Sequence, residues 1–142
     1  AGLGTITPAS GFVGPGGALV IGISAGFVCY NATVFLKQKL KIDDSLDVFP
    51  VHGIGGLLGT LLAAVFASDA LGVFSGQGLG GVSIGEQLYV QVVGVLATGL
   101  YAAIASFVLL KLVDVLLGLR VSSDEETEGL DLTQHNERGY DL

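Results

Sequence analysis

Residues 17–36 form a run of 20 amino acids without one charged side chain. An α-helix of that length crosses the roughly 30 Å hydrocarbon core of a bilayer, because each residue adds about 1.5 Å. Residues 48–67 form a second apolar run, which only His52 interrupts, and residues 87–119 form a third with two charged residues. The runs predict three transmembrane helices. The third would be about 50 Å long, so it must tilt strongly, kink or project into water.

The composition excludes the common soluble classes. Hydrophobic residues make up 51% of the 142-residue chain, charged residues only 13%, and the mean hydropathy is +0.73. An average soluble domain has about 25% charged residues, and a chain of this size has too little interior to hide so much apolar surface. A water-soluble fold, a disordered chain and a basic nucleic-acid-binding protein are therefore excluded. The sequence predicts an all-α integral membrane protein that contacts membrane lipid and no nucleic acid.

The basic residues predict the orientation of the spans. Residues 68–86, which join the second and third spans, contain none. The positive-inside rule then places residues 37–47 and everything after the third span in the cytoplasm. We therefore predict a membrane part over residues 1–120 and a cytoplasmic tail over residues 121–142. The six bases are Lys37, Lys39, Lys41, Lys111, Arg120 and Arg138.

The tail carries most of the net charge. Seven acids and one base give residues 121–142 a charge of −6, out of −7 for the whole chain. Ser123 followed by Glu126 matches a capping box, and Gly129 is a plausible stop, so a short helix is predicted over residues 123–128. The alternative is a solvated acidic segment without a specific role.

The N-terminal segment is rich in residues that interrupt helices. Residues 1–15 contain two prolines and four glycines, and we expect them to be the end of a preceding span followed by a loop. The chain begins with neither an initiator methionine nor a signal peptide, so we expect it to be a piece of a longer polypeptide.

Residue patterns typical of enzymes are missing from the sequence. The single cysteine, Cys29, offers no disulfide framework. No spacing typical of a metal site, a nucleophile elbow or a pair of catalytic carboxylates is found. We therefore expect no enzyme activity, no cofactor and no metal.

His52 is the one ionisable residue well inside a short span. If the helix begins near Asp43 or Asp44, His52 lies roughly 12 to 14 Å along it, close to mid-membrane. Ionisable groups at that depth are costly and usually face a cavity, which makes His52 a candidate for relaying a proton or accepting a hydrogen bond from a small polar solute. The alternative is a structural histidine that hydrogen-bonds to a neighbouring helix.

Residue spacing along the helices predicts further contacts. Glycines at i, i+3 or i+4 let two helices approach closely, so they favour packing over a pore lining. Lys111 and Asp114 are three residues apart and are predicted to pair on one helix face. The glycines so spaced are Gly55, Gly56 and Gly59 in the second span and Gly22 and Gly26 in the first.

Four segments carry a family likeness that covers essentially the whole chain. They are ITPASGFVGPGGA at 6–18, KIDDSLDVFPVHGIGG at 41–56, GLRV at 118–121 and EGLDLTQHNERGY at 128–140. In this order they closely resemble the C-terminal portion of the ammonium transporters, the Amt/Mep/Rh family. The resemblance implies a homotrimer in the cell membrane, each subunit having eleven spans in two inverted halves and its own narrow pore. This chain would supply the end of the eighth span, the ninth to eleventh spans and the cytoplasmic tail.

The resemblance also implies roles for single residues. His52 matches the second of two paired pore histidines, and the first belongs to the missing half. We expect Val48 and Phe49 to line the pore one turn toward the cytoplasm. Desolvating an ammonium ion in an apolar channel is costly, so the ion would be recruited outside and deprotonated, and ammonia would pass the histidines.

The tail has its own implied function. In the family it contacts neighbouring subunits and couples their pores, and in many microbes PII signal proteins block the cytoplasmic exits. PII is thus an implied partner. The residues that match this coupling are Gly129, Asp131, His135 and Tyr140, with Lys41 and Asp44 in the facing loop.

Two residues depart from the family's pattern. Pro50 stands where glycine is usual, which predicts a kink that shifts His52. Asn136 replaces a usual glycine in the tail, and asparagine tolerates left-handed backbone.

Two other functions stay open. One is an ammonium sensor that signals through the tail. The other is a different secondary transporter with interrupted helices, which would need further charged residues in the spans.

Overall fold

The computed structural model describes residues 1–74 and 76–140, and every regular element there is helical. The chain divides into two compact units, Ala1–Thr98 and Gly99–Leu142. Among the short turns, η1 and η4 are 3-10 helices, whereas η2 and η3 are π-helices. The elements are α1 (Gly2–Ile6), η1 (Thr7–Ala9), α2 (Pro15–Val34), η2 (Phe35–Lys39), η3 (Phe49–Ile54), α3 (Gly55–Phe66), η4 (Asp69–Phe74), α4 (Ile84–Leu117), α5 (Ser123–Glu128) and α6 (Leu130–His135).

Three helical segments are long and apolar enough to span a membrane. They are Pro15–Lys39, Phe49–Phe66 and Ile84–Leu117, which coincide with the three predicted spans. The all-α membrane architecture is therefore confirmed. The third segment is one continuous helix of 34 residues, about 51 Å long, and none of its residues is buried.

The helix starts follow from residues with known capping behaviour. Pro15 occupies the first turn of α2, where its missing N–H costs nothing. At α4, the Ser83 backbone N–H donates to Glu86 Oε2 at 3.0 Å, and the Glu86 backbone N–H donates to Ser83 Oγ at 3.2 Å. This capping box starts α4 three residues before the predicted span. The N-terminal segment is helical through α1 and η1 and then turns before Pro15, as expected for a helix end followed by a loop.

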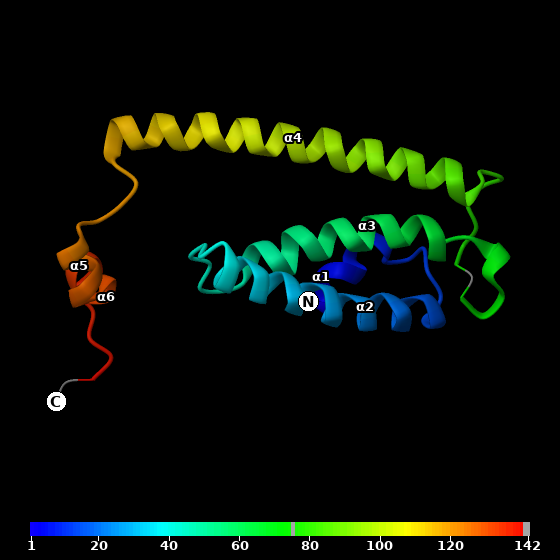
Figure 1. Ribbon diagram of the computed structural model, residues 1–142, viewed down its shortest axis with the longest axis horizontal. Helices are drawn as coiled ribbons and strands as arrows, with labels where there is room; N and C mark the ends of the chain where they lie inside the picture. Colours follow the sequence, from blue (N-terminus) through cyan, green and yellow to red (C-terminus); the bar gives the residue numbers. More distant parts are fainter. Residues whose placement is uncertain (75, 141–142) are drawn as a thin grey trace. The chain divides into compact units, whose positions relative to one another are not determined.

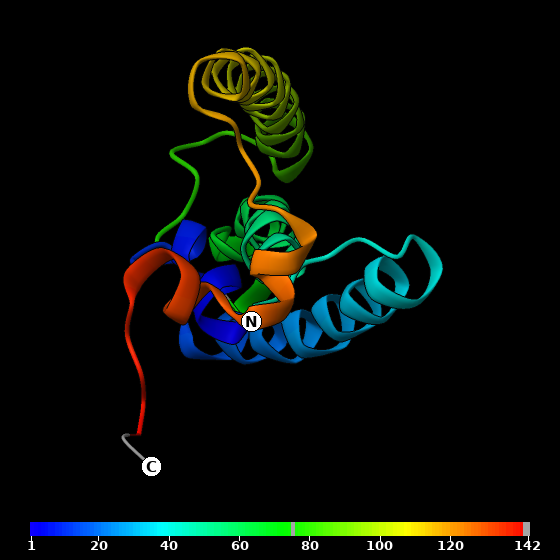
Figure 2. The same ribbon diagram turned by 90° about the vertical axis from the view of Figure 1, so that its left-hand side faces the viewer.

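In the first unit, α1, α2 and α3 lie side by side (Figure 1). Ala9, Ile21 and Ala63 form the centre of a small buried apolar cluster among them. The loop at 40–48, which joins the π-helical end of α2 to η3, lies at the near end of this unit in Figure 2, where it is drawn in cyan. It brings the ends of the first two spans together.

Glycines decide how closely the three helices approach. A Cβ atom on Gly59 would overlap the backbone carbonyl of Thr5, and one on Gly55 would lie 2.7 Å from Thr5 Oγ1. The packing role predicted for these two glycines is confirmed. A Cβ on Gly56, Gly22 or Gly26 would meet nothing within 4 Å in the described residues, so their packing role stays a prediction.

The tail is helical rather than an unstructured acidic segment. Helix α5 spans the predicted residues 123–128, but its capping box is Ser122 with Glu125, because Ser123 is already the first helical residue. The predicted pair of Ser123 and Glu126 was therefore wrong by one position. The Ser122 backbone N–H donates to Glu125 Oε2 at 2.8 Å and lowers the pKa of Glu125 by stabilising the carboxylate.

Two further contacts belong to the second unit. Helices α5 and α6 contact each other on either side of Gly129 (Figure 2). In α4, Lys111 Nζ lies 3.6 Å from Asp114 Oδ2, which confirms the predicted ion pair.

Candidate functional site

The three candidate pore residues lie at the start of the second span. Val48 is the N-cap of the π-helical turn η3, Phe49 is its first residue, and His52 lies within it. The expectation that the helix begins near Asp43 or Asp44 was wrong. His52 is three residues from the observed start, about 4.5 Å along the helix, so the predicted distance of 12 to 14 Å is wrong. The mid-membrane depth of His52 stays a prediction.

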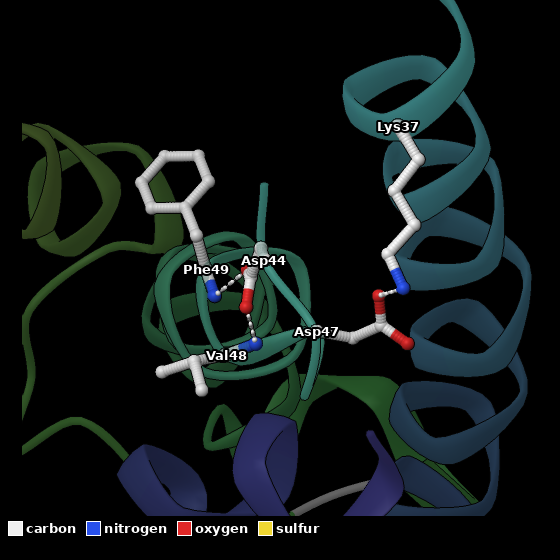
Figure 3. Close-up of polar contacts among 5 residues, drawn as sticks. All are labelled: Lys37, Asp44, Asp47, Val48 and Phe49. Atoms are coloured by element: carbon white, nitrogen blue, oxygen red, sulfur yellow. Dashed lines mark hydrogen bonds and ion pairs between the residues drawn. The ribbon is translucent and has the colours of Figure 1, made fainter. Parts of the chain in front are cut away.

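Asp44 caps this helix although it lies four residues before Val48 in the sequence (Figure 3). Its Oδ1 accepts a hydrogen bond from the Val48 backbone N–H and its Oδ2 accepts one from Phe49, both at 2.9 Å. Asp47, which lies between, has a left-handed backbone with φ of 55°. Because the chain turns at Asp47, the helix cannot extend back to Asp44, and the carboxylate instead satisfies its first free N–H groups.

Pro50 lies in the first turn of η3, where a proline displaces no helical hydrogen bond, and the predicted kink stays a prediction. It is fully buried, and the N–H that it lacks would have been one of the unpaired donors at the helix start. The next donor, the Val51 N–H, bonds to the Asp47 carbonyl oxygen at 3.0 Å. Residues 46 and 47 are not helical, so no preceding turn exists for the proline ring to displace. The π-helical turn passes directly into α3.

His52 itself is open to its surroundings. Its side chain is exposed and makes no hydrogen bond to any residue that the structure describes. The nearest part of α1 is Gly4, where a Cβ atom would lie 3.6 Å from His52 Nδ1. The alternative of a histidine held by a neighbouring helix is thus not met within this part of the chain, and both ring nitrogens are available to a ligand or to another segment.

Phe49 is held at its backbone, and its ring lies over a glycine. Asp44 holds its N–H, and the ring lies over Gly53, where a Cβ atom would come within 3.0 Å of Phe49 Cδ2. A residue with a Cβ atom at position 53 would have to displace this ring. Gly53 was not among the predicted site residues, although its position directly after the candidate histidine was a usable signal.

A second polar contact joins the two spans beside this turn. Lys37 Nζ, from η2, lies 2.8 Å from Asp47 Oδ1 (Figure 3). Lys37 was predicted only to orient the spans, and Asp47 was not predicted to have a role. A lysine and an aspartate ten residues apart carry no pairing signal until the loop between them is known to fold back.

The tail residues that are predicted to couple the subunits lie in or beside α6. Gly129 separates α5 from α6 and has φ of 109°, whereas Asp131 and His135 belong to α6 and Tyr140 follows it as an exposed residue. Asn136 ends α6 in the left-handed conformation, as expected for asparagine in place of glycine. Lys41 also has a left-handed backbone. The predicted contact of the tail with Lys41 and Asp44 stays a prediction.

The Asp44 cap predicts a pH-dependent contribution to stability. Hydrogen bonds from the Phe49 and Val48 N–H groups lower the pKa of Asp44. The cap is therefore at full strength above the unfolded pKa of about 3.9 and is lost as pH falls through the lower folded value. In the full-length protein in detergent, Asp44→Ala should lower the melting temperature at pH 7, and the difference from the parent should vanish in acid. Asp43→Ala is the matched control, and an equal loss in that variant would contradict the cap.

Comparison with known proteins finds relatives along the whole chain. The model of the Ammonium Transporter Family matches residues 1–140. The ammonium transporter Amt1 of Archaeoglobus fulgidus is 46% identical over 140 residues, which cover 99% of this chain and 35% of that protein. The ammonium transporter of Bacillus subtilis is 42% identical over 142 residues, covering 99% and 34% respectively. The chain thus spans about a third of the length of the curated relatives that it matches.

Proposed function

Because the chain belongs to the ammonium transporter family, we propose that the full-length protein moves ammonium across a membrane along a path that passes His52. The observation that carries this proposal is the unpartnered imidazole of His52 in the first turn of a membrane-spanning segment. Val48 and Phe49 beside it are 51% and 58% exposed, so their apolar side chains are free to line a path with the rest of the polypeptide.

Apolar walls and a neutral imidazole suit the passage of ammonia better than that of the ion. An unpaired cation in an apolar path has a large desolvation penalty, whereas ammonia has none from charge. Neutral imidazole has one nitrogen that accepts a hydrogen bond and one that donates. His52 would therefore hydrogen-bond to ammonia, or take up the proton that ammonium loses as it becomes ammonia, together with a second histidine from the remainder of the polypeptide.

The proposed assembly is a homotrimer in the cell membrane with the tail in the cytoplasm. The lysine-rich loop and the tail lie on the same side of the three spans by the positive-inside rule. Gly129, Asp131, His135 and Tyr140 would couple the subunits, facing Lys41 and Asp44. A PII signal protein is the proposed regulator at that face.

An ammonium sensor is the second candidate, in which helices α5 and α6 of the tail would carry the signal. In that case the same site binds ammonium without significant flux.

Transport and sensing are distinguished in liposomes that contain the full-length protein. An ammonium pulse should produce a charge movement or a pH change that a potassium pulse and protein-free liposomes do not produce. Absence of any signal from a correctly assembled protein that still binds ammonium would contradict transport and support the sensor.

A further inference from the structure

Lys37 and Asp47 form an ion pair between two segments that the sequence separates by a loop. Lys37 belongs to η2, at the end of the first span, and Asp47 directly precedes Val48. The two atoms are 2.8 Å apart, within reach of an ion pair. Asp47 Oδ1 is shielded from solvent and accepts no hydrogen bond in the described residues, so the nearby lysine charge is what stabilises it.

Asp47 also determines how the next helix begins. Its left-handed backbone, with φ of 55°, turns the chain into η3, and its carbonyl oxygen accepts the Val51 N–H at 3.0 Å. Few residues other than glycine adopt this conformation without cost, although aspartate is among the more tolerant. A contact that holds the Asp47 side chain therefore also stabilises the turn that places Val48.

No other charged group of the loop competes for this role in the described residues. The Asp44 carboxylate is occupied by the Val48 and Phe49 N–H groups, and Lys39 and Lys41 form no ion pair there. The charge of Lys37 also lowers the pKa of Asp44, but less than the backbone hydrogen bonds from Phe49 and Val48 do. One lysine thus lies close to both aspartates that shape the start of η3.

We propose that Lys37 and Asp47 are a positioning pair, which fixes the end of the first span against the start of η3 and so sets where Val48, Phe49 and His52 lie. Neither residue is assigned contact with the transported molecule. The proposal rests on the proposed function only where its effect is measured as ammonium transport. The position of the turn is measurable without any transport assay.

A double-mutant cycle in the full-length protein tests the pair. Lys37→Gln and Asp47→Asn each remove one charge, and asparagine keeps the tolerance for left-handed backbone. Each single variant should lower the maximal rate of ammonium transport about tenfold, and the double variant should be no worse than either. The ammonium concentration at half-maximal rate should not change, and Lys37→Arg should keep most of the rate. Lys39→Gln, from the same turn, is the matched control.

Hydrogen exchange gives a readout that does not depend on transport. The Val51 amide should exchange faster in both single variants and in the double variant to the same extent, but not in Lys39→Gln. Effects that multiply in the double variant, or single variants that behave like Lys39→Gln, would overturn the pair. If the parent protein moves no ammonium but the Val51 exchange follows the cycle, the proposed function fails and the positioning pair stands.

Discussion

Gly59→Ala is expected to prevent α1 from packing against α3. The new methyl group would overlap the backbone carbonyl of Thr5, which cannot rotate away as a side chain would. Alanine favours a helix over glycine by about 1 kcal/mol, but overpacking of this kind costs about 1–3 kcal/mol and more where backbone must move. We expect the full-length variant to lose about 2 kcal/mol or more of stability, measured by unfolding in detergent and by the yield of assembled protein.

Gly56→Ala is the matched control for this steric effect. It adds the same methyl group to the same helix, where the described residues leave open space within 4 Å. Its stability should equal or exceed that of the parent because of the gain in helix propensity. Equal losses in the two variants would show that the close contact of Gly59 with Thr5 does not determine how α1 packs.

Gly129→Asp is expected to leave the protein assembled and to abolish transport. Gly129 has φ of 109°, a region that residues with a side chain occupy only at a cost of about 1–3 kcal/mol. It joins α5 to α6, so a change of backbone there reorients the two helices relative to each other. The added carboxylate also lies next to Glu128 and near Asp131 and is repelled by both. The measurement is ammonium-triggered charge movement, with the oligomeric state determined in parallel.

Gly139→Asp separates the backbone effect from the charge effect. It introduces the same charge into the same tail, at a glycine that has no left-handed backbone and open space around it. We expect Gly139→Asp to keep most of the transport rate, and Gly129→Ala to behave like Gly129→Asp. Full activity of Gly129→Asp would rule out the coupling role of this position.

The spans were predictable because length and the absence of charge suffice to identify them. The ends of the spans were less predictable, because they depend on single polar contacts. Helix α4 starts early because Ser83 and Glu86 cap each other, and η3 starts late because Asp44 caps it across a left-handed turn at Asp47. The start expected near Asp43 or Asp44 therefore gave the wrong position of His52 along the helix.

The environment of the candidate site was only partly predictable. His52, Val48 and Phe49 were selected by their place in the second span and by the family's motif. The π-helical turn was not predicted, because an apolar run reads the same whether its hydrogen bonds skip four residues or five. Nor does spacing show that Gly59 is crowded while Gly56 is not, since that depends on where α1 packs.

The most direct test of the account compares the full-length parent with His52→Ala in liposomes, by ammonium-triggered charge movement with and without potassium. His52 has no partner in the described residues, so its removal should leave the fold intact. The account predicts that the variant assembles normally and that its ammonium signal is lost or no longer selective over potassium. An unchanged signal with unchanged selectivity would show that the ammonium path does not depend on His52.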